Sequence, residues 1–318
     1  MTLESMKIAV VGSYGAGLTM RVPRSPEAGE TLSGGVFDSG PGGKGSNQAV
    51  AAARLGAQVS LLTAVGADDF GRAAHVLWER EGVDASKTLT GRGATMVGFI
   101  LVEPSGENRI AIAPGALDEL DTAAVDAFRD EIAAADILVV SMEIPLDAVV
   151  HALRVAREVG TRTLLNPAPA RALPDDAWEL IDIITPNQTE APVLLGRAPG
   201  DGATERDLVA ALRARTGGAV LLTRGASGAL LADADGEHEI APVAPTAVVD
   251  TTGAGDAFTA ALAVAVAAGA PLADAAAYAA HAGAHTVAAA GVVPALPTAD
   301  QLPALPTTPT PGSIGPAR

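Results

Sequence analysis

The feature that most constrains the fold of this chain is the alternation of short, uninterrupted apolar runs with alanine-rich stretches. The apolar runs are KIAVVG, VSLLTAVG, ILVVSME, TRTLLNPA, IDIITPN and AVLLTRG. Between them lie SNQAVAAARLG, FGRAAHVLWEREG, LDAVVHALRVAREVG and RDLVAALRARTG, each ending in glycine as helices often do. Strands that are apolar throughout are buried on both faces. The pattern therefore predicts an α/β fold with a mostly parallel central sheet covered by helices on both faces.

Two segments depart from this alternation. Residues 18–39 contain prolines and glycines and are expected to form extended strands and turns, and residues 94–113 are typical of a β-hairpin. Two β-only insertions predict a small separate sheet that covers the site as a lid. Two unconnected surface hairpins are the alternative. We expect one domain over residues 1–303 and a disordered, proline-rich tail over 304–318.

Charge and composition exclude several classes of function. The net charge is −16 and no basic stripe is present, so neither nucleic acid nor an anionic membrane is an expected partner. The first residues, MTLESMKIAVVG, have no basic segment before the apolar run, which argues against a signal peptide. The longest apolar stretch is broken by Gly269 and Pro271 and predicts a buried helix. We therefore expect a cytoplasmic protein.

A glycine-rich stretch, GSYGAGLTM, follows the first apolar run. Gly12, Gly15 and Gly17 have the spacing G-x-x-G-x-G, the reverse of the order that dinucleotide-binding turns require. The residues that follow include two prolines and cannot form the helix that such a turn must open. The acidic residues about twenty positions later fall inside the first β insertion, not at the end of a second strand. These features argue against a nicotinamide-dependent oxidoreductase.

The most informative segment is VVDTTGAGDAFTAALAVAVAAG. Gly253, Ala254 and Gly255 form a small turn before a long helix, so that backbone N–H groups there can face an anion. Asp256 stands at the start of that helix. One interpretation is a general base beside an anion hole, which is the arrangement that phosphoryl transfer to a hydroxyl group needs. The alternative is an acid that caps the helix or complements its dipole.

A second glycine turn precedes an earlier helix, in SGPGGKGSNQAVAAARLG. Gly42, Gly43, Lys44 and Asn47 lie on this turn or just after it. The spacing is not that of a P-loop. Such a turn allows the backbone to approach a small polar ligand closely, and Asn47 offers both a donor and an acceptor. A plain turn into a helix with a solvated lysine is the alternative.

Two further stretches suit a nucleotide and its metal. In DIITPNQTEA, Asn187 and Glu190 could organise waters around magnesium, which prefers oxygen ligands, or could simply cap a helix. In VLLTRGASGALL, a strand, a glycine turn and a second strand could hold a nucleotide against the backbone. The same stretch could equally be a plain hairpin.

Together these stretches resemble the ribokinase/PfkB family of carbohydrate kinases. GGKGSNQAVAAARLGA is similar to the N-terminal signature of the family and DTTGAGDAFTAAL to its C-terminal signature, while NPAPA and DIITPNQTEA are similar to the ribokinases within it. The resemblance extends from about residue 6 to residue 300. It implies a three-layer α/β/α ribokinase-like fold, transfer of the γ-phosphate of ATP to a sugar hydroxyl group, ribose as the first candidate acceptor, and a homodimer formed through the β lid.

The resemblance also implies roles for individual residues. Asp256 matches the catalytic base, and the backbone of Gly253, Ala254 and Gly255 matches the anion hole. The positions that match the sugar site are Gly42, Gly43, Lys44, Asn47, Glu143 and Asp256. Those that match the ATP site are Asn187, Thr223, Gly225, Ala226, Gly228, Gly255 and Ala280. Asn187 and Glu190 match the motif that organises magnesium through waters. An activating potassium ion would be held by Asp250 and by carbonyl groups of Thr252, Thr286, Ala289 and Gly291.

The sequence departs from the family at a few of its usual positions. Gly15 and Gly17 stand where ribokinases usually carry an Asn and an Asp that hold sugar hydroxyl groups. Ala280 replaces an Asn of the adenine pocket, and Ala295 replaces a hydroxyl ligand of potassium. A hydrogen bond to a charged group is worth about 1.5–3 kcal/mol, so the loss at Gly17 could cost one to two decades of ribose affinity.

These departures leave the acceptor open. A pocket lined by glycines has more room and makes fewer hydrogen bonds, which favours a substituted sugar, a fructose-like sugar or a nucleoside. Alternatively, a ribokinase could recover the lost contacts from Glu143, Asn47 or Asp256. A protein that binds sugar or nucleotide without turnover is a further hypothesis, against which the intact anion turn and Asp256 argue.

Overall fold

The computed structural model describes residues 6–105, 107–198 and 202–307. Nine strands of this part of the chain form a central sheet in the order β15-β14-β13-β12-β11-β10-β1-β4-β6. The parallel strands are β1 (Lys7–Val11), β4 (Gln58–Leu62), β6 (Val83–Asp84), β10 (Ile137–Ser141), β11 (Arg162–Asn166), β12 (Ile183–Ile184) and β13 (Ala219–Thr223). At one edge, β14 (Ala229–Asp233) and β15 (Gly236–Ile240) run antiparallel. The predicted mostly parallel sheet is confirmed.

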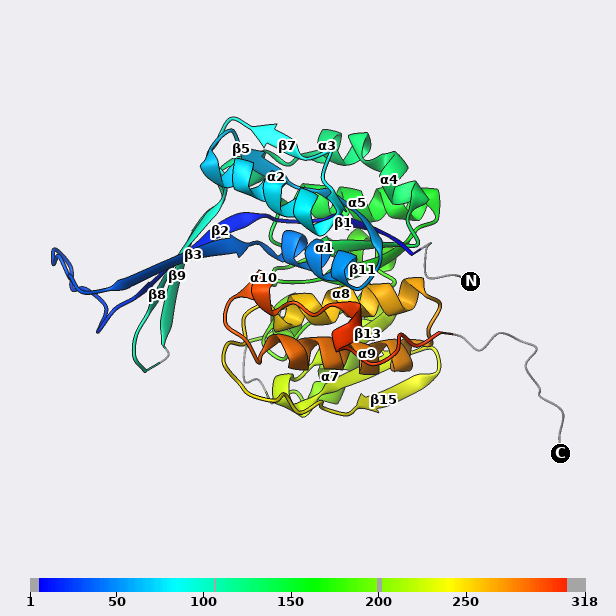
Figure 1. Ribbon diagram of the computed structural model, residues 1–318. Coiled ribbons are helices and arrows are strands. Elements are labelled where there is room, and N and C mark those ends of the chain that lie inside the picture. The colour runs from blue at the N-terminus through cyan, green and yellow to red at the C-terminus, as the bar shows by residue number, and fades with distance from the viewer. Residues whose placement is uncertain (1–5, 106, 199–201, 308–318) are drawn as a thin grey trace.

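Helices cover both faces of this sheet and complete three layers (Figure 1). One face packs against α1 (Lys44–Arg54), α2 (Asp69–Glu81), α8 (Ala254–Ala267), α9 (Leu272–Thr286) and α10 (Val292–Ala295). The other packs against α3 (Thr122–Ala127), α4 (Arg129–Ala134), α5 (Leu146–Val159), α6 (Glu190–Leu194) and α7 (Glu205–Thr216). Successive residues of β1 serve opposite cores, since Ile8 and Val10 join the first and Ala9 and Val11 the second. Apolar side chains on both faces of the strand explain why the strand sequences are continuous instead of alternating.

The structure confirms one element boundary predicted from the sequence and changes another. The long alanine-rich segment ends as α8 at Ala267, and α9 begins at Leu272, on either side of the predicted break at Gly269 and Pro271. The run VSLLTAVG was expected to be one strand but divides into β4 and β5 (Ala64–Gly66). β5 pairs with β7 (Leu89–Gly91) outside the central sheet. Short 3₁₀ turns complete the fold: η2 (Gly115–Glu119), η3 (Asp175–Leu180), η4 (Gly225–Ser227) and η5 (Ala299–Gln301).

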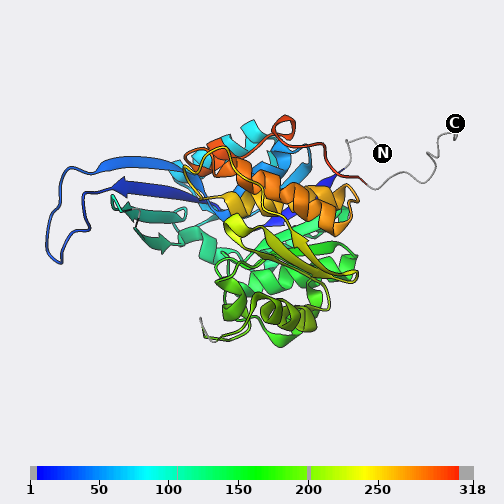
Figure 2. The same cartoon turned by 90° about the horizontal axis from the view of Figure 1, so that it is seen from below.

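The two β insertions form one lid sheet that projects from the body (Figures 1 and 2). Its strands, in spatial order, are β3 (Val36–Gly42), β2 (Gly15–Arg21), β8 (Val97–Val102) and β9 (Asn108–Ala113). Parallel pairing of β2 with β8 joins the insertions, so the alternative of two unconnected hairpins is wrong. The lid begins earlier than predicted, and Gly15 and Gly17 lie in a strand instead of a turn.

Three further predictions concern membrane-spanning helices, the C-terminal tail and the extent of the domain. In the described ranges, no helix combines the length and the apolar character needed to cross a membrane. Most of the tail predicted to be disordered, residues 308–318, lies outside the described residues. Residues 304–307 form no helix or strand. The extent of a single domain, residues 1–303, stays a prediction.

Candidate active site

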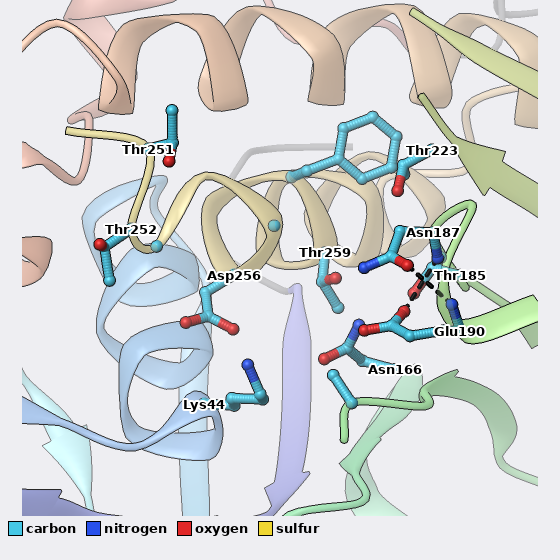
Figure 3. A pocket seen from close by; sticks show the side chains of 14 residues that line it. Lys44, Asn166, Thr185, Asn187, Glu190, Thr223, Thr251, Thr252, Asp256 and Thr259 are labelled. Carbon is cyan, nitrogen blue, oxygen red and sulfur yellow. Dashed lines mark hydrogen bonds between the residues drawn. The ribbon is translucent and has the colours of Figure 1, made fainter. Parts of the chain in front are cut away.

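A cavity of about 280 Å³ lies where the carboxyl ends of the central strands face the N-terminus of α8 (Figure 3). Ligands of open α/β sheets generally bind at this edge. The residues that line the cavity are Lys44, Asn166, Ala168, Thr185, Asn187, Glu190, Thr223, Thr251, Thr252, Gly253, Gly255, Asp256, Phe258 and Thr259. The structure thus brings together candidate residues from four separate sequence motifs.

Asp256 is held from the side by helix α1. Its carboxylate accepts hydrogen bonds from Asn47 Nδ2 at 2.8 Å and from Gln48 Nε2 at 3.1 Å. The N-cap of α8 is Gly253, and no side chain caps this helix end. Because Gly253 is the N-cap and both oxygens of Asp256 accept from α1, the capping alternative is wrong. Asp256 does lie in the first turn of α8, where its charge complements the helix dipole as the other part of that alternative expects. The carboxylate is fixed within the cavity, where it can meet a substrate.

The surroundings of Asp256 and Lys44 raise the pKa of both side chains. Burial raises the pKa of Asp256, and the Lys44 ammonium and the two amide donors only partly offset this effect. Burial lowers the pKa of Lys44, but the negative charges of Asp256, Glu143 and Glu190 outweigh it, so that the pKa lies above its ordinary value. Lys44 points toward Asp256 in Figure 3. The cavity therefore holds a permanent cation beside a carboxyl group that accepts a proton more readily than an exposed aspartate.

The turn before α8 depends on glycine. Gly253 has a φ of 82°, and a Cβ there would lie 2.5 Å from Cγ1 of Val292. The first N–H groups of a helix have no partner within the helix. Since Gly253 and Gly255 line the cavity, these N–H groups and the positive end of the helix dipole adjoin it. This turn can stabilise an anion beside the Asp256 carboxyl group.

Asn187 and Glu190 lie across the cavity from Asp256 and form a capping arrangement (Figure 3). The backbone N–H of Asn187 donates to Glu190 Oε2 at 2.8 Å, and Asn187 Oδ1 accepts from the backbone N–H groups of Thr189 and Glu190, both at 2.9 Å. The capping alternative is therefore correct for these atoms. Burial raises the pKa of Glu190. Both residues nevertheless line the cavity, and a carboxylate there is a chemically suitable ligand for a cation.

The nucleotide candidates divide into two groups. Asn187, Thr223 and Gly255 line the cavity, and a backbone bridge joins Asn187 to Thr223. Gly225, Ala226 and Gly228 form the adjoining turn between β13 and β14, which is the predicted strand, turn and strand. Ala280 lies in α9 and packs against the core, and it does not line the cavity.

The residues predicted to bind the acceptor sugar include Glu143, whose hydrogen bonds connect it to the second glycine turn. Its Oε2 accepts a hydrogen bond from the Ser13 hydroxyl group at 2.5 Å and one from the backbone N–H of Lys44 at 3.1 Å. Gly43 has a φ of 90°, and a Cβ there would lie 2.5 Å from the Tyr14 Cα. Glycine is thus required for the second glycine turn to pack on residues 13–15. Gly42 pairs with Gly15 in the lid sheet, so the turn and the lid are continuous.

The expectation of extra room at Gly15 is wrong. A Cβ at Gly15 would collide with the side chain of Met96 and would lie 2.9 Å from its carbonyl oxygen. Methionine therefore occupies the space that a side chain at position 15 would need. At Gly17 the nearest atom to a Cβ is the Gly40 carbonyl oxygen at 3.7 Å, so the expectation of room holds there.

The candidate potassium ligands lie together beside the anion turn. Asp250 Oδ1 accepts from the backbone N–H of Thr252 at 2.9 Å, and Oδ2 accepts from that of Gly291 at 3.2 Å. Burial raises the pKa of Asp250, but these hydrogen bonds outweigh it and the pKa is lowered. Thr286 and Ala289 belong to the neighbouring turn, where the Ala289 N–H meets the Thr286 carbonyl oxygen at 3.5 Å. Ala295 is buried in α10.

The sequence did not reveal Gln48, Asn166 or Ser13 as site residues. Gln48 Nε2 donates to Asn166 Oδ1 at 3.2 Å as well as to Asp256. Among the described residues, the buried Asn47 Oδ1 and Gln48 Oε1 have no hydrogen-bond partner. A buried polar atom of this kind calls for a ligand or a water. The available signal was the adjacency of Gln48 to Asn47 on an otherwise alanine-rich helix, and the position of Asn166 at a strand end.

Comparison with known proteins agrees with this geometry. The family profile described as pfkB family carbohydrate kinase matches residues 5–299. The ribokinase of Schizosaccharomyces pombe is 38% identical over 304 residues, which cover 92% of this chain and 95% of that protein. The deoxyribokinase of Salmonella typhi is 34% identical over 258 residues, which cover 80% of this chain and 83% of that protein.

A solved structure of the Arabidopsis thaliana ribokinase complexed with ribose and ATP has the same fold, with a TM-score of 0.86 and 27% identity. The match covers 93% of this chain and 97% of that chain. The family profile and the sequence relatives indicate a carbohydrate kinase, and the solved ribokinase structure has the fold described above. The chain therefore belongs to the pfkB family of carbohydrate kinases and is an ATP-dependent sugar kinase.

Proposed function

We propose that this protein transfers the γ-phosphate of ATP to a hydroxyl group of a pentose, with ribose as the first candidate acceptor. The observation that carries the proposal is the buried carboxyl group of Asp256, held by Asn47 and Gln48 beside the glycine turn at the start of α8. Several similar proteins bear the name ribokinase, and the structural neighbour from Arabidopsis thaliana was solved with ribose and ATP.

The proposed mechanism assigns the proton to Asp256. The carboxylate takes the proton of the sugar hydroxyl group as its oxygen attacks the γ-phosphorus, and the bond to the β-phosphate oxygen breaks, releasing ADP. A raised pKa suits a base that works near neutral pH. The N–H groups of the Gly253, Ala254 and Gly255 turn stabilise negative charge on the phosphoryl group. The Lys44 ammonium adds a positive charge on the same side.

The acceptor is bound by the second glycine turn and Glu143. The backbone of Gly42 and Gly43 approaches the sugar, and Glu143 accepts hydrogen bonds from its hydroxyl groups. Asn47 Oδ1, which is buried and unpaired in the described structure, accepts a further sugar hydroxyl group. This is how the protein recovers the hydrogen bonds that Gly15 and Gly17 cannot make.

ATP occupies the other end of the cavity. Asn187 and Thr223 line it, with Gly225, Ala226 and Gly228 beside the nucleotide. We leave Ala280 out of the proposed site because it packs against the core.

Two cations accompany the nucleotide. The Glu190 carboxylate fits a magnesium ion held through waters, with Asn187 beside it, since oxygen atoms line that wall and magnesium retains much of its hydration. Magnesium, when bound, neutralises phosphate charge. The second ion is potassium, which adds positive charge behind the anion turn. Its proposed ligands are Asp250 and the carbonyl groups of Thr252, Thr286, Ala289 and Gly291.

We further propose a cytoplasmic homodimer that forms through the lid. Met20, Phe37 and Phe99 are 41%, 60% and 56% exposed. Pairing across the strands places Met20 opposite Phe37, and Leu18 opposite Phe99, on one face of the lid. An exposed apolar patch of this kind is typical of a protein–protein interface.

A kcat/KM panel of ribose, deoxyribose, fructose and nucleosides with ATP tests the proposal through ADP release. We expect turnover with pentoses and a lead of ribose over fructose and nucleosides. A lead of nucleosides or fructose would replace the proposed acceptor with the second candidate, which the open space at Gly17 favours. ATP binding without ADP release for any acceptor would contradict a kinase function.

A further inference from the structure

Gln48 is a buried amide that connects Asp256 to a second element of the cavity. It lies in α1 and is 1% exposed. Its Nε2 atom donates to Asp256 Oδ1 at 3.1 Å and to Asn166 Oδ1 at 3.2 Å. An amide nitrogen carries two protons, so these two acceptors use both of them. Because an ionised carboxylate can only accept, it fixes the orientation of the Gln48 amide and, through it, that of Asn166.

This connection joins three elements that are far apart in the sequence. α1 supplies Gln48, the end of β11 supplies Asn166 and the first turn of α8 supplies Asp256. Asn166 and Asp256 also line the cavity (Figure 3). The other carboxylate oxygen of Asp256, Oδ2, accepts from Asn47 Nδ2 at 2.8 Å. The carboxylate is therefore held at both oxygens, and without Gln48 it could turn about the hydrogen bond from Asn47.

Packing does not explain an amide at position 48. The residues that follow it in α1, Ala49, Val50 and Ala51, are apolar and buried. Gln48 Oε1 has no hydrogen-bond partner within the described part of the chain, and a buried polar atom in this state destabilises a protein. A methionine would fill a similar space without this penalty. The amide is therefore better explained by what its nitrogen does for Asp256.

The groups around Asp256 shift its pKa in opposite directions. Burial has the largest effect and raises the pKa, and the Glu143 carboxylate, which follows β10, also raises it. The Lys44 ammonium at the start of α1 and the two amide hydrogen bonds lower it. Glu190, across the cavity, acts on Lys44. The hydrogen bond from Gln48 therefore favours the ionised carboxylate, which is the form that can take a proton from the acceptor.

We propose that Gln48, anchored by Asn166, is a positioning residue that orients the Asp256 carboxylate and holds it ionised for proton transfer. Gln48 acts through Asp256 and does not itself line the cavity, so it affects the chemical step and leaves the binding of ATP nearly unchanged. The proposal rests on the proposed function, because it takes Asp256 to be the base.

The first test is Gln48→Met, which keeps the approximate size of the side chain and removes its donor. kcat and kcat/KM are measured against pH with the acceptor that the substrate panel ranks first. We expect the plateau kcat to fall about tenfold or more, while KM for ATP stays within about threefold. Loss of the donor raises the pKa of Asp256, so the acid limb of the profile should move to higher pH by about one unit. Gln58→Met, at an exposed glutamine that begins β4, is the matched control and should change neither.

The second test asks whether Asn166 acts through Gln48. Asn166→Leu alone should lower kcat and move the acid limb in the same direction by a smaller amount. In a Gln48→Met background it should have no further effect, because the connection is already broken. Effects of the two substitutions that simply multiply would overturn the anchoring role of Asn166.

Thermal melting identifies a variant that fails to fold, and Asn166→Leu supplies the pH profile if Gln48→Met is lost in this way. The proposal is overturned if the folded variants keep the wild-type kcat and acid limb, or if Gln48→Met raises KM for ATP instead of lowering kcat. Near-normal turnover of Asp256→Asn would overturn the assignment of the base and the inference with it. Low turnover of Asp256→Asn together with an unchanged Gln48→Met would overturn the inference alone.

Discussion

The floor of the cavity, which is formed around Asp256 by α1, the end of β11 and the start of α8, differs in construction from the lid sheet. Around Asp256, side chains from α1 and the end of β11 form a buried hydrogen-bonded network. In the lid, Gly17 pairs with Gly40 on one side and with Gly98 on the other, so a row of bare backbone crosses β3, β2 and β8. Many other lid side chains are exposed. The floor holds its polar groups in fixed positions, whereas the lid offers few side chains to a ligand.

Because of this difference, we expect the rate of the reaction and the choice of acceptor to depend on different regions of the molecule. Chemistry that needs a positioned base and an anion hole depends on the floor, where a displaced group costs orders of magnitude in rate. We expect acceptor preference to depend on the lid and on Glu143, where single hydrogen bonds change affinity by smaller factors. Substitutions in the two regions should therefore differ in size and in the kinetic constant they alter.

The largest effect is expected for Asp256→Asn. Loss of the base should lower kcat by about 10²–10⁴ or more, while ATP affinity measured by calorimetry stays within a few-fold of wild type. Asp274→Asn is the matched control, since Asp274 is an exposed first-turn acid of the next helix, α9. Near-normal turnover in Asp256→Asn would show that this carboxyl group is not the base.

The second-largest effect on kcat is expected in the anion turn, residues 253–255. Gly253→Ala forces a Cβ into a left-handed backbone conformation and against Val292, so the N–H groups of the turn should move. We expect kcat to fall by about 10²–10³, the cost of one lost anion-hole donor. Gly160→Ala has the same backbone strain, with φ 80°, but no atom near its Cβ, and should leave kcat unchanged. Equal kinetics for the two variants would argue against an anion hole at this turn.

A smaller effect, on acceptor binding, is expected for Glu143→Gln. The substitution removes the charged acceptor that Ser13 and the Lys44 N–H share, and that the sugar would also use. A hydrogen bond to a charged group is worth about 1.5–3 kcal/mol, so kcat/KM should fall ten- to a hundredfold, mainly through KM. Asp147→Asn, at a nearby exposed site, serves as the control. A loss confined to kcat would show that Glu143 acts in the chemical step and not in acceptor binding, and would contradict the proposed difference between the two regions.

The smallest effect on chemistry is expected in the lid. Phe99→Lys changes an exposed side chain that does not line the cavity, so kcat should stay within about twofold and the free energy of unfolding within about 0.5 kcal/mol. Sedimentation should nevertheless show a shift toward monomer, because a charge enters the proposed dimer face. A tight dimer in this variant would place the interface elsewhere.

The sequence predicted those parts of the floor whose signals are local. Apolar strands indicated the sheet, and the glycine turn before an alanine-rich helix indicated the site of Asp256. Contacts between distant segments were not visible in the sequence: Gln48 and Asn166 lie 118 residues apart. The same reason explains the error at Gly15. A glycine in a sequence gives no sign that a methionine from a distant segment of the chain fills its space.

The central claim is that phosphate passes from ATP to a sugar hydroxyl group through the floor of this cavity. Phosphorus NMR of the wild-type enzyme with magnesium, ATP and ribose follows the three phosphorus products in one sample. We predict that ADP and a sugar phosphate appear in equal amounts, and that neither forms at a comparable rate with Asp256→Asn. ADP accompanied by inorganic phosphate in place of a sugar phosphate, or equal product formation in the two proteins, would contradict the account.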